Sequence, residues 1–261
     1  KENISWVECN LSDLSSLTPV VKKFNPEIII HLAWQDIPDF SSSSSFNNLK
    51  ISIDFFQTIW ALESCQKILV AGSCFEYNRN LGICTETDVT LAKDFFTWAK
   101  LSLLNYLLLE CQQREIDLAW FRLFYVYGHR QRADSLLPTL IKNIKRNQVP
   151  PLSSPKNRND FVYIDDVAKA FELSLTTKFP SGIYNLGTGN MTSVLQCCQI
   201  VEKIIHNNNH LSNSLAIQVN QSEADVEFYA STKLTSKQIG WEAKTSILDG
   251  INQTIDSMYN L

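Results

Sequence analysis

Glycine is scarce in this chain of 261 residues, and it appears late. Only eight glycines occur, and the first of them is Gly72. The stretch before Gly72 therefore contains no glycine-rich turn of the kind that brings a backbone close to phosphate groups. The chain also opens on Lys1 instead of methionine. These two features predict a processed sequence, or a fragment whose front is missing.

Three further absences limit the class of protein. No apolar run reaches the roughly 18–20 residues that a membrane span requires, and no signal-peptide pattern opens the chain. The 23 basic and 27 acidic side chains form no basic run or stripe, so the charge gives no support to binding of a nucleic-acid backbone. The seven cysteines are odd in number and form no C-x-x-C pair. They predict reduced core thiols in a cytoplasmic protein.

Metal binding has one weak candidate, the stretch "HNNNH" with His206 and His210. Two histidines four residues apart on a helix can bind zinc. Three asparagines between them favour a loop, however, and no third ligand is evident. We therefore expect no metal site.

Short apolar runs alternate with segments of helical period in the first half of the chain. Runs that are apolar on both faces, separated by helices of a dozen or more residues, are typical of a parallel sheet covered on both sides. Such sheets bind their ligands at the carboxyl ends of the strands. The fold class expected is therefore α/β with a doubly wound, Rossmann-like parallel sheet. The predicted strands are "ISWVECN", "EIIIHLA", "KILVAGS" and "DLAWFRLF", and the predicted helices are "LSSLTPVVKKF", residues 47–65 and residues 94–113.

The pattern loosens beyond about residue 130. We expect helices at "SLLPTLIKNIKR" and "TSVLQCCQIVEKII", a strand leading into a helix at "DFVYIDDVAKAFELSL", a strand and turn at "GIYNLGTGN", a strand at "SLAIQVN" and two closing helices. The polar stretches "FSSSSSF" and "NQVPPLSSPKNRN" predict loops.

Several motifs occur in an order that resembles one enzyme family. They are "HLAW", "NNLKISIDFF", "VAGSCFEYN", "WFRLFYVYG", "DFVYIDDVAKAF", "YNLGTGN" and "IGWEAKTSILDGI". In this order they are similar to the landmarks of the extended short-chain dehydrogenases/reductases, the NAD(P)-dependent epimerases and dehydratases that act on nucleotide sugars. The resemblance covers essentially the whole chain and implies a sheet that lacks its first strands. It also implies a smaller substrate lobe, interleaved with the sheet domain.

The resemblance implies roles for particular residues. Residues 1–128 and about 160–190 would bind NAD or NADP, and about 129–159 and 191–261 would form the substrate lobe. Ser73 would hold the reacting oxygen, and Lys100 would bind ribose hydroxyls and tune the local charge. Further cofactor contacts would come from Asn10, Leu11, Leu32, Ala33 and Asn48, and substrate contacts from Tyr77, Tyr125, Arg132 and Arg158.

The chemistry needs an acid or base beside the lysine. A phenol with a pKa near 10 is a poor base at neutral pH, and a nearby ammonium lowers that pKa. Residues four apart share a helix face, so Tyr-x-x-x-Lys suits this task. In "KDFFTWAKLSLLNYL" the lysine is Lys100, but Phe96 stands where the tyrosine is needed. A water held by Ser73 and Lys100 could carry the proton.

Three other departures from the family pattern affect ligand binding. The glycine-rich turn after the first strand is absent. Asn10 stands where the family usually has an aspartate, and Asn159 where it generally has an arginine that grips the diphosphate, with Arg158 one position earlier. His31, by contrast, is expected to be an ordinary histidine with satisfied hydrogen bonds at a strand end.

Two functions therefore remain open. One is a nucleotide-sugar epimerase, dehydratase or ketoreductase in deoxysugar or surface-polysaccharide synthesis, with activity weakened at Phe96. The other is a non-catalytic protein that binds a nucleotide sugar or serves assembly. A third, weaker hypothesis is a fragment that does not fold stably. The resemblance also implies a homodimer built through the helices at 47–65 and 94–113, whereas the sugar, the nucleotide and NAD versus NADP stay open.

Overall fold

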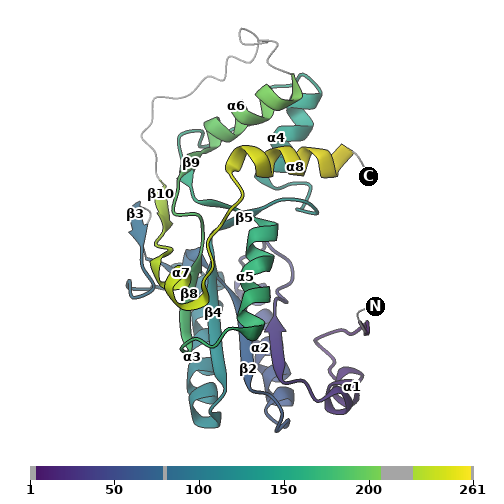
Figure 1. Ribbon diagram of the computed structural model, residues 1–261. Helices are drawn as coiled ribbons and strands as arrows, with labels where there is room; N and C mark the ends of the chain where they lie inside the picture. The colour runs from purple at the N-terminus through teal and green to yellow at the C-terminus, as the bar shows by residue number, and fades with distance from the viewer. Residues whose placement is uncertain (1–3, 79–80, 207–225, 260–261) are drawn as a thin grey trace. The chain divides into compact units, whose positions relative to one another are not determined.

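The computed structural model describes residues 4–78, 81–206 and 226–259 (Figure 1). The chain divides into two compact units. The first comprises residues 1–78, 89–122 and 180–183, and the second residues 79–88, 123–179 and 184–261. The division predicted between a dinucleotide-binding part and a substrate lobe stays a prediction. Within the described ranges, no helix is both long and apolar enough to cross a bilayer.

The first unit is built on a sheet with the strand order β1-β2-β4-β8. Its strands are β1 (Ile28–His31), β2 (Lys67–Ser73), β4 (Asp117–Leu123) and the first residues of β8 (Gly182–Leu186). β1 and β2 are parallel, with Ile28 opposite Lys67 and His31 opposite Val70. Three strands predicted from apolar runs are therefore confirmed. Parallel strands need long crossovers, which the helices between them provide.

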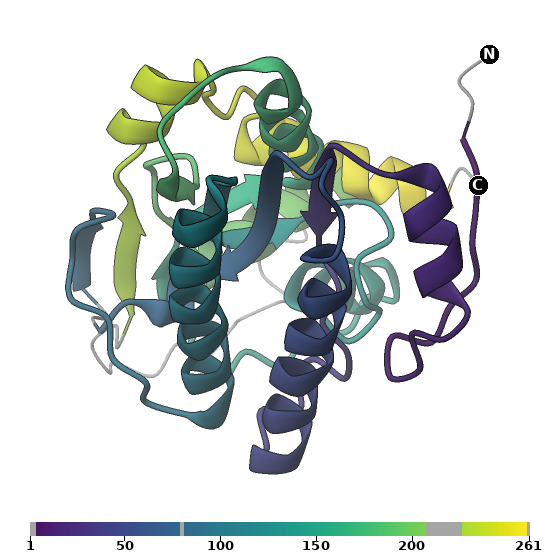
Figure 2. The same cartoon turned by 90° about the horizontal axis from the view of Figure 1, so that it is seen from below.

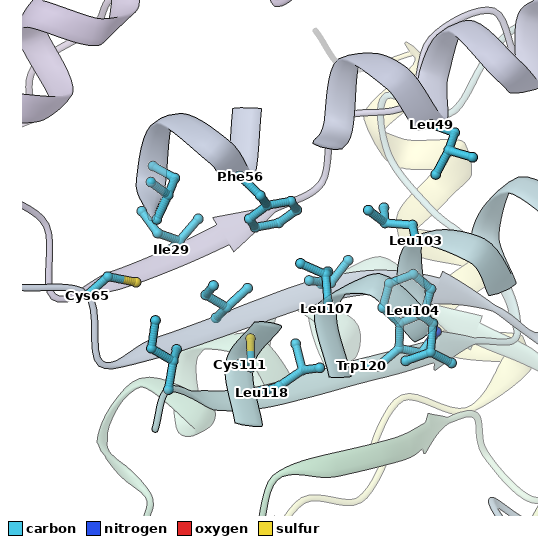
Figure 3. Packing of buried hydrophobic residues seen from close by; sticks show 14 of the residues in the cluster. Ile29, Leu49, Phe56, Cys65, Leu103, Leu104, Leu107, Cys111, Leu118 and Trp120 are labelled. Carbon is cyan, nitrogen blue, oxygen red and sulfur yellow. The ribbon is translucent and has the colours of Figure 1, made fainter. Parts of the chain in front are cut away.

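The helices of this unit are α1 (Leu17–Phe24), α2 (Ser42–Ile59) and α3 (Phe95–Arg114). α2, in dark blue, and α3, in teal, run side by side over the sheet (Figure 2). Their buried side chains interlock with those of the strands in one apolar core, part of which is shown in Figure 3. The core residues include Ile29, Leu49, Phe56, Ile68, Leu103, Leu107, Leu118 and Trp120. This burial is the main stabilising contribution to the unit.

α2 begins earlier than the sequence predicts. The stretch "FSSSSSF" was expected to be a loop, but Ser42–Ser45 form the first turn of α2. Ser41 is the N-cap, and its hydroxyl accepts a hydrogen bond from the Ser44 backbone N–H at 3.3 Å. Serine is a good cap residue although it is a mediocre helix former. The prediction was therefore wrong because it treated the polar run as a loop signal alone.

The strand predicted at "ISWVECN" is also wrong. Residues 4–10 have no regular secondary structure, and the Trp6 side chain is 91% exposed. No described strand pairs with this segment. An apolar run forms a strand only when a neighbour accepts its backbone hydrogen bonds and covers its side chains.

The second unit contains smaller sheets and a helical layer. One sheet has the order β3-β10-β6-β9, and β5 pairs in parallel with β7. α4, α6 and α8 pack around a core that includes Tyr127, Leu140, Ile144, Cys198, Val201 and Ile251. The strands are β3 (Leu81–Cys84), β5 (Tyr125–Tyr127), β6 (Arg158–Asn159), β7 (Phe161–Tyr163), β9 (Thr192–Ser193) and β10 (Glu227–Ala230). The helices are α4 (Leu136–Lys145), α5 (Ile164–Thr176), α6 (Val194–Ile205), α7 (Lys233–Ile239) and α8 (Ile247–Tyr259).

Most of the elements predicted here are present. Among the described residues, the helices and strands expected in this half are confirmed, except that the loop "NQVPPLSSPKNRN" ends in the short strand β6. The predicted strand "SLAIQVN" and His210 lie outside the described residues. All seven cysteines are free, and six of them are buried, as the reduced-thiol prediction requires.

Candidate active site

Ser73 lies at the point where β2 turns into a short 3-10 helix, η1 (Cys74–Glu76). Its hydroxyl accepts a hydrogen bond from the Phe75 backbone N–H at 3.2 Å. Its own backbone N–H donates to the Glu76 carboxylate at 2.8 Å. These two bonds form a capping box, which fixes the turn and with it the position of the hydroxyl.

Lys100 approaches the same strand end from α3. Its ammonium donates to the Ala71 carbonyl oxygen at 2.8 Å and lies 3.9 Å from the centre of the Trp34 ring. The side chain is only 5% exposed. Burial lowers the pKa of Lys100 to about 8, and the negative charge of Glu76 opposes that shift. The amine therefore changes charge close to neutral pH.

Phe96 belongs to an aromatic cluster that closes this end of the site. Its ring centre lies 4.8 Å from that of Phe40, 5.7 Å from that of Trp34 and 6.5 Å from that of Phe75. Phe96 itself is 5% exposed. The position that needs a phenol thus carries a buried apolar ring, and none of these four rings offers a hydroxyl proton.

A cavity of about 170 Å³ opens beside β1. Its lining includes three predicted cofactor residues, Leu11, Ala33 and Asn48, together with His31 and Ser52. The His31 Nε2 atom is buried and has no hydrogen-bond partner in the described part of the chain. The prediction of a satisfied histidine is therefore wrong. A buried ring nitrogen without a partner on a cavity wall is a position that a ligand could satisfy.

A second hollow of about 520 Å³ adjoins this cavity, since both include Leu11 and Gln35. Asn10 and Ser16 also line it. Together the two hollows offer apolar side chains and a few hydroxyl, amide and imidazole groups, with the Glu8 carboxylate and the Cys9 thiol at the larger one. This donor set fits the adenosine half of a dinucleotide. At the Lys100 end of the site, the Trp34 ring lies over the ammonium that, by the resemblance, would bind the ribose.

Of the predicted cofactor residues, Asn48 lines the smaller cavity with a side chain that is already hydrogen-bonded, and Leu32 lies outside both hollows. The Asn48 side chain is buried and bonds Gln35 N–H at 2.8 Å, Gln35 O at 3.2 Å and Ser44 O at 3.0 Å. It therefore ties the segment after β1 to α2. Leu32 is 61% exposed and does not line either hollow.

The predicted substrate residue Tyr77 is completely buried, and its ring lies 4.4 Å from the guanidinium carbon of Arg122. Arg122 in turn donates to the Glu76 carboxylate at 2.8 Å. Sequence reasoning missed Glu76, although it lies inside the motif "VAGSCFEYN". Its partners Trp120 and Arg122 come from a strand more than forty positions away, so no local spacing signals the contact.

The other predicted substrate residues belong to the second unit. Tyr125 packs against Phe161 and Phe228, with ring centres 5.8 and 6.1 Å away. Arg132 is 3.9 Å from the Asp134 carboxylate, and Arg158 is 3.6 Å from that of Glu227. Both arginines keep partly exposed side chains. Their roles toward a substrate stay predictions.

With this geometry established, comparison with known proteins is informative. Residues 1–187 match the profile of the NAD dependent epimerase/dehydratase family. The chain belongs to this family. The resemblance inferred from the ordered motifs is thereby confirmed, and the curated relatives of the chain include enzymes named for reactions of nucleotide sugars.

Two curated relatives in this family show how far the similarity extends. CDP-abequose synthase from Salmonella muenchen is 31% identical over 136 residues, which are 51% of this chain and 45% of that protein. The chain thus matches about half the length of the synthase. The dTDP-4-dehydro-6-deoxyglucose reductase from Escherichia coli is 23% identical over 255 residues, 94% of this chain and 79% of that protein.

Solved structures of epimerases and dehydratases share the fold. UDP-glucose 4-epimerase from Thermotoga maritima superposes with a TM-score of 0.83 at 19% identity, over 97% of this chain and 84% of that one. A tyrosine-to-phenylalanine mutant of UDP-glucuronic acid 4-epimerase from Bacillus cereus, solved with NAD and UDP-4-deoxy-4-fluoro-glucuronic acid, gives 0.79 at 19% identity, over 97% of this chain and 81% of that one. The predicted Rossmann-like α/β class is confirmed.

Proposed function

We propose that this protein is an NAD(P)-dependent enzyme that acts on a nucleotide-linked deoxysugar, with proton transfer weakened by Phe96. The observation that carries the proposal is that Ser73 and Lys100 meet at the end of β2. Ser73 is the last residue of this strand, and the Lys100 ammonium donates to the carbonyl oxygen of Ala71 in it. Among the epimerase, dehydratase and ketoreductase alternatives, the name of one curated relative, dTDP-4-dehydro-6-deoxyglucose reductase, favours ketone reduction. Surface polysaccharides are the products that the deoxysugar branch would serve.

The cofactor would bind along the hollows beside β1. Leu11, Ala33 and the free His31 nitrogen would face the adenosine half, and Asn10 would border the adenine. The nicotinamide supplies the hydride for ketone reduction when the cofactor is bound. Lys100 can meet the ribose only if Trp34 moves from its ammonium, because the ring lies 3.9 Å from it.

The chain's own residues would act on the reacting oxygen and its proton. The Ser73 hydroxyl would donate a hydrogen bond to the ketone oxygen, leaving its contact with the Phe75 N–H as acceptor. A water molecule held by Ser73 and Lys100 would replace the phenol that Phe96 lacks. The Lys100 ammonium would stabilise negative charge on that oxygen, and this help is strongest below its pKa of about 8.

The test is a fluorescence titration with NADH and NADPH, followed by turnover assays on 4-keto deoxysugar nucleotides. Micromolar binding of either cofactor is expected. Phe96→Tyr restores the phenol four residues before Lys100, so we expect turnover to rise by about 10²- to 10⁴-fold. Phe95→Tyr, a matched change at the neighbouring and half-exposed position, should leave turnover unchanged.

Two results would count against this proposal. If the folded protein, expressed from its complete reading frame, binds neither cofactor, the oxidoreductase function is ruled out. A Phe96→Tyr variant that binds NADH but turns over no faster than Phe95→Tyr shows that a phenol is not what the site lacks.

A second candidate function is a non-catalytic nucleotide-sugar-binding or assembly protein on the same fold. The aromatic cluster favours it, because Trp34, Phe40 and Phe75 pack closely against Phe96. This candidate predicts nucleotide-sugar binding by calorimetry without cofactor binding, whereas the enzyme predicts both.

We further propose a cytoplasmic homodimer. Seven free cysteines agree with a reducing compartment. The dimer would form through α2 and α3, where several large apolar side chains are exposed, namely Phe46, Phe95, Trp98, Leu108 and Leu109.

A further inference from the structure

Glu76 is the most completely buried carboxylate near the candidate active site. It has no exposed surface, and three donor groups bond its two oxygens. The Ser73 N–H donates at 2.8 Å, the Trp120 indole N–H lies 3.0 Å from both oxygens, and Arg122 Nε donates at 2.8 Å. A buried carboxylate with this many donors is a built feature, because a missing donor would leave a costly unpaired group.

Glu76 and Lys100 form hydrogen bonds to opposite ends of the same backbone segment, Ala71 to Ser73. Lys100 donates to the carbonyl oxygen of Ala71, and Glu76 accepts from the N–H of Ser73. Gly72 lies between these two contacts. A Cβ atom added to Gly72 would lie 2.8 Å from Glu76 Oε1 and 2.1 Å from the Trp120 indole nitrogen. The carboxylate therefore lies directly against the backbone that carries Ser73.

We propose that Glu76 is a positioning residue of this site: it fixes the backbone from which Ser73 projects, and it offsets the charge of Lys100 across the same strand end. This inference rests on the proposed function, but its first test does not require activity. Ser73 would touch the substrate, whereas Glu76 acts only through Ser73 and Lys100. Arg122 pairs with Glu76 at 2.8 Å, and the Glu76 charge also raises the pKa of Lys100 against the effect of burial.

The electrostatic surroundings of Lys100 agree with this role. Burial lowers its pKa to about 8, and Glu76 is the charged group that works against the shift. His31 is the other titratable group coupled to Lys100, and the ammonium contributes to the lowered pKa of His31. Since His31 is neutral near pH 7, Glu76 is the group whose removal should change the charge on Lys100 most.

The test is an NMR titration of Lys100 in protein labelled with ¹³C at the lysine Cε positions, with the signal assigned by its loss in Lys100→Arg. In the wild type the midpoint is expected at about pH 8. In Glu76→Gln it should fall below about pH 7, because the opposing charge is gone. Glu110→Gln removes a charge from an exposed pair on the same helix and should leave the midpoint unchanged.

The single variant Glu76→Gln leaves the buried Arg122 guanidinium without its carboxylate partner, which could prevent folding. The double variant Glu76→Gln/Arg122→Met removes both buried charges and avoids this problem. It too should show a lowered Lys100 midpoint. A folded variant of either kind whose Lys100 midpoint matches that of the wild type would overturn the proposal.

The second readout is kinetic. With the keto-sugar nucleotide, Glu76→Gln should lower kcat at least tenfold and change KM by less than about twofold, because Ser73 is misplaced at the reacting oxygen while the nucleotide contacts persist. An unchanged kcat in a folded variant would contradict positioning of Ser73. A wild type without cofactor binding would defeat the proposed function, whereas the NMR result would still decide the role of Glu76 toward Lys100.

Discussion

At the scale of single residues, Gly72 illustrates how tightly the end of β2 is packed. An alanine there would place its methyl group 2.1 Å from Trp120 Nε1, which is far inside van der Waals contact. We expect Gly72→Ala to destabilise the protein by about 1–3 kcal/mol through overpacking. Urea unfolding would measure this. A Gly72→Ala variant as stable as the wild type would contradict the packing argument.

His31 gives a second residue-scale prediction. Burial, followed by the charge of Lys100, lowers its pKa to about 4, whereas an unfolded histidine titrates near 6.5. As the pH falls from 6.5 to 4, His31 binds a proton in the unfolded chain but stays neutral in the folded protein. The free energy of unfolding should therefore decrease by about 2–3 kcal/mol across this window.

The measurement is urea unfolding at a series of pH values. His31→Leu should lose most of the slope between pH 6.5 and 4. His129→Gln, changed at an exposed histidine, should retain it. If His31→Leu keeps the wild-type slope, another group causes the pH dependence.

The sequence predicted some of these residues and missed others for a physical reason. Ser73 and Lys100 could be proposed as site residues because a strand end and a helical spacing of four are local patterns. Glu76 was missed because its partners Trp120 and Arg122 lie on β4. The unpaired His31 nitrogen could not be predicted either, because its hydrogen bonding depends on neighbours that only the fold brings near.

At the scale of elements, the start of α3 matters most, because its first two turns carry Phe96 and Lys100. Asp94 caps this helix: its carboxylate accepts from the Thr97 N–H at 2.7 Å, and the Thr97 hydroxyl accepts from the Asp94 N–H at 3.2 Å. We expect Asp94→Ala to cost about 0.5–2 kcal/mol in stability.

Thermal and urea unfolding would check the cap. The matched control is Asp54→Ala on α2, which breaks an exposed pair with Lys50 and should cost only about 0.3–0.5 kcal/mol. Asp94→Asn should keep much of the cap, because an amide oxygen can still accept the Thr97 bond. Equal stability of Asp94→Ala and wild type would show that the first turn of α3 is held by packing alone.

Boundaries of elements were harder to predict than their existence. The two-sided apolar runs of β1, β2 and β4 needed no knowledge of partners, and all three were predicted. "ISWVECN" also contains apolar residues but has no described strand beside it, and "FSSSSSF" contains the N-cap and the first turn of α2. Composition identifies what a segment can become, whereas neighbours and caps decide where it starts.

At the scale of the whole molecule, the outward sides of α2 and α3 bear on assembly. Leu109 is 62% exposed, and Trp98 and Phe95 are also partly exposed. Apolar groups of this size on adjacent helices are typical of a protein interface. We expect a dimer in solution by light scattering, and Leu109→Glu combined with Trp98→Glu should convert it to monomer, because charge is strongly disfavoured at an interface core.

The control for this experiment is Leu175→Glu, which changes an exposed leucine on α5 and should leave the mass unchanged. A wild-type protein that is monomeric at micromolar concentration would rule out this dimer.

The contact between Gly72, Glu76 and Trp120 has a consequence for the descent of this protein. Trp120 donates to Glu76, and Gly72 has no Cβ atom that would collide with either side chain. Replacing any one of the three is therefore harmful while the other two stay. Because Trp120 lies nearest to the place that a Cβ on Gly72 would take, a lineage that replaced this tryptophan by a smaller residue would release the glycine from constraint. In distant homologues, we therefore expect a glycine immediately before this serine to occur together with a tryptophan at the Trp120 position of β4.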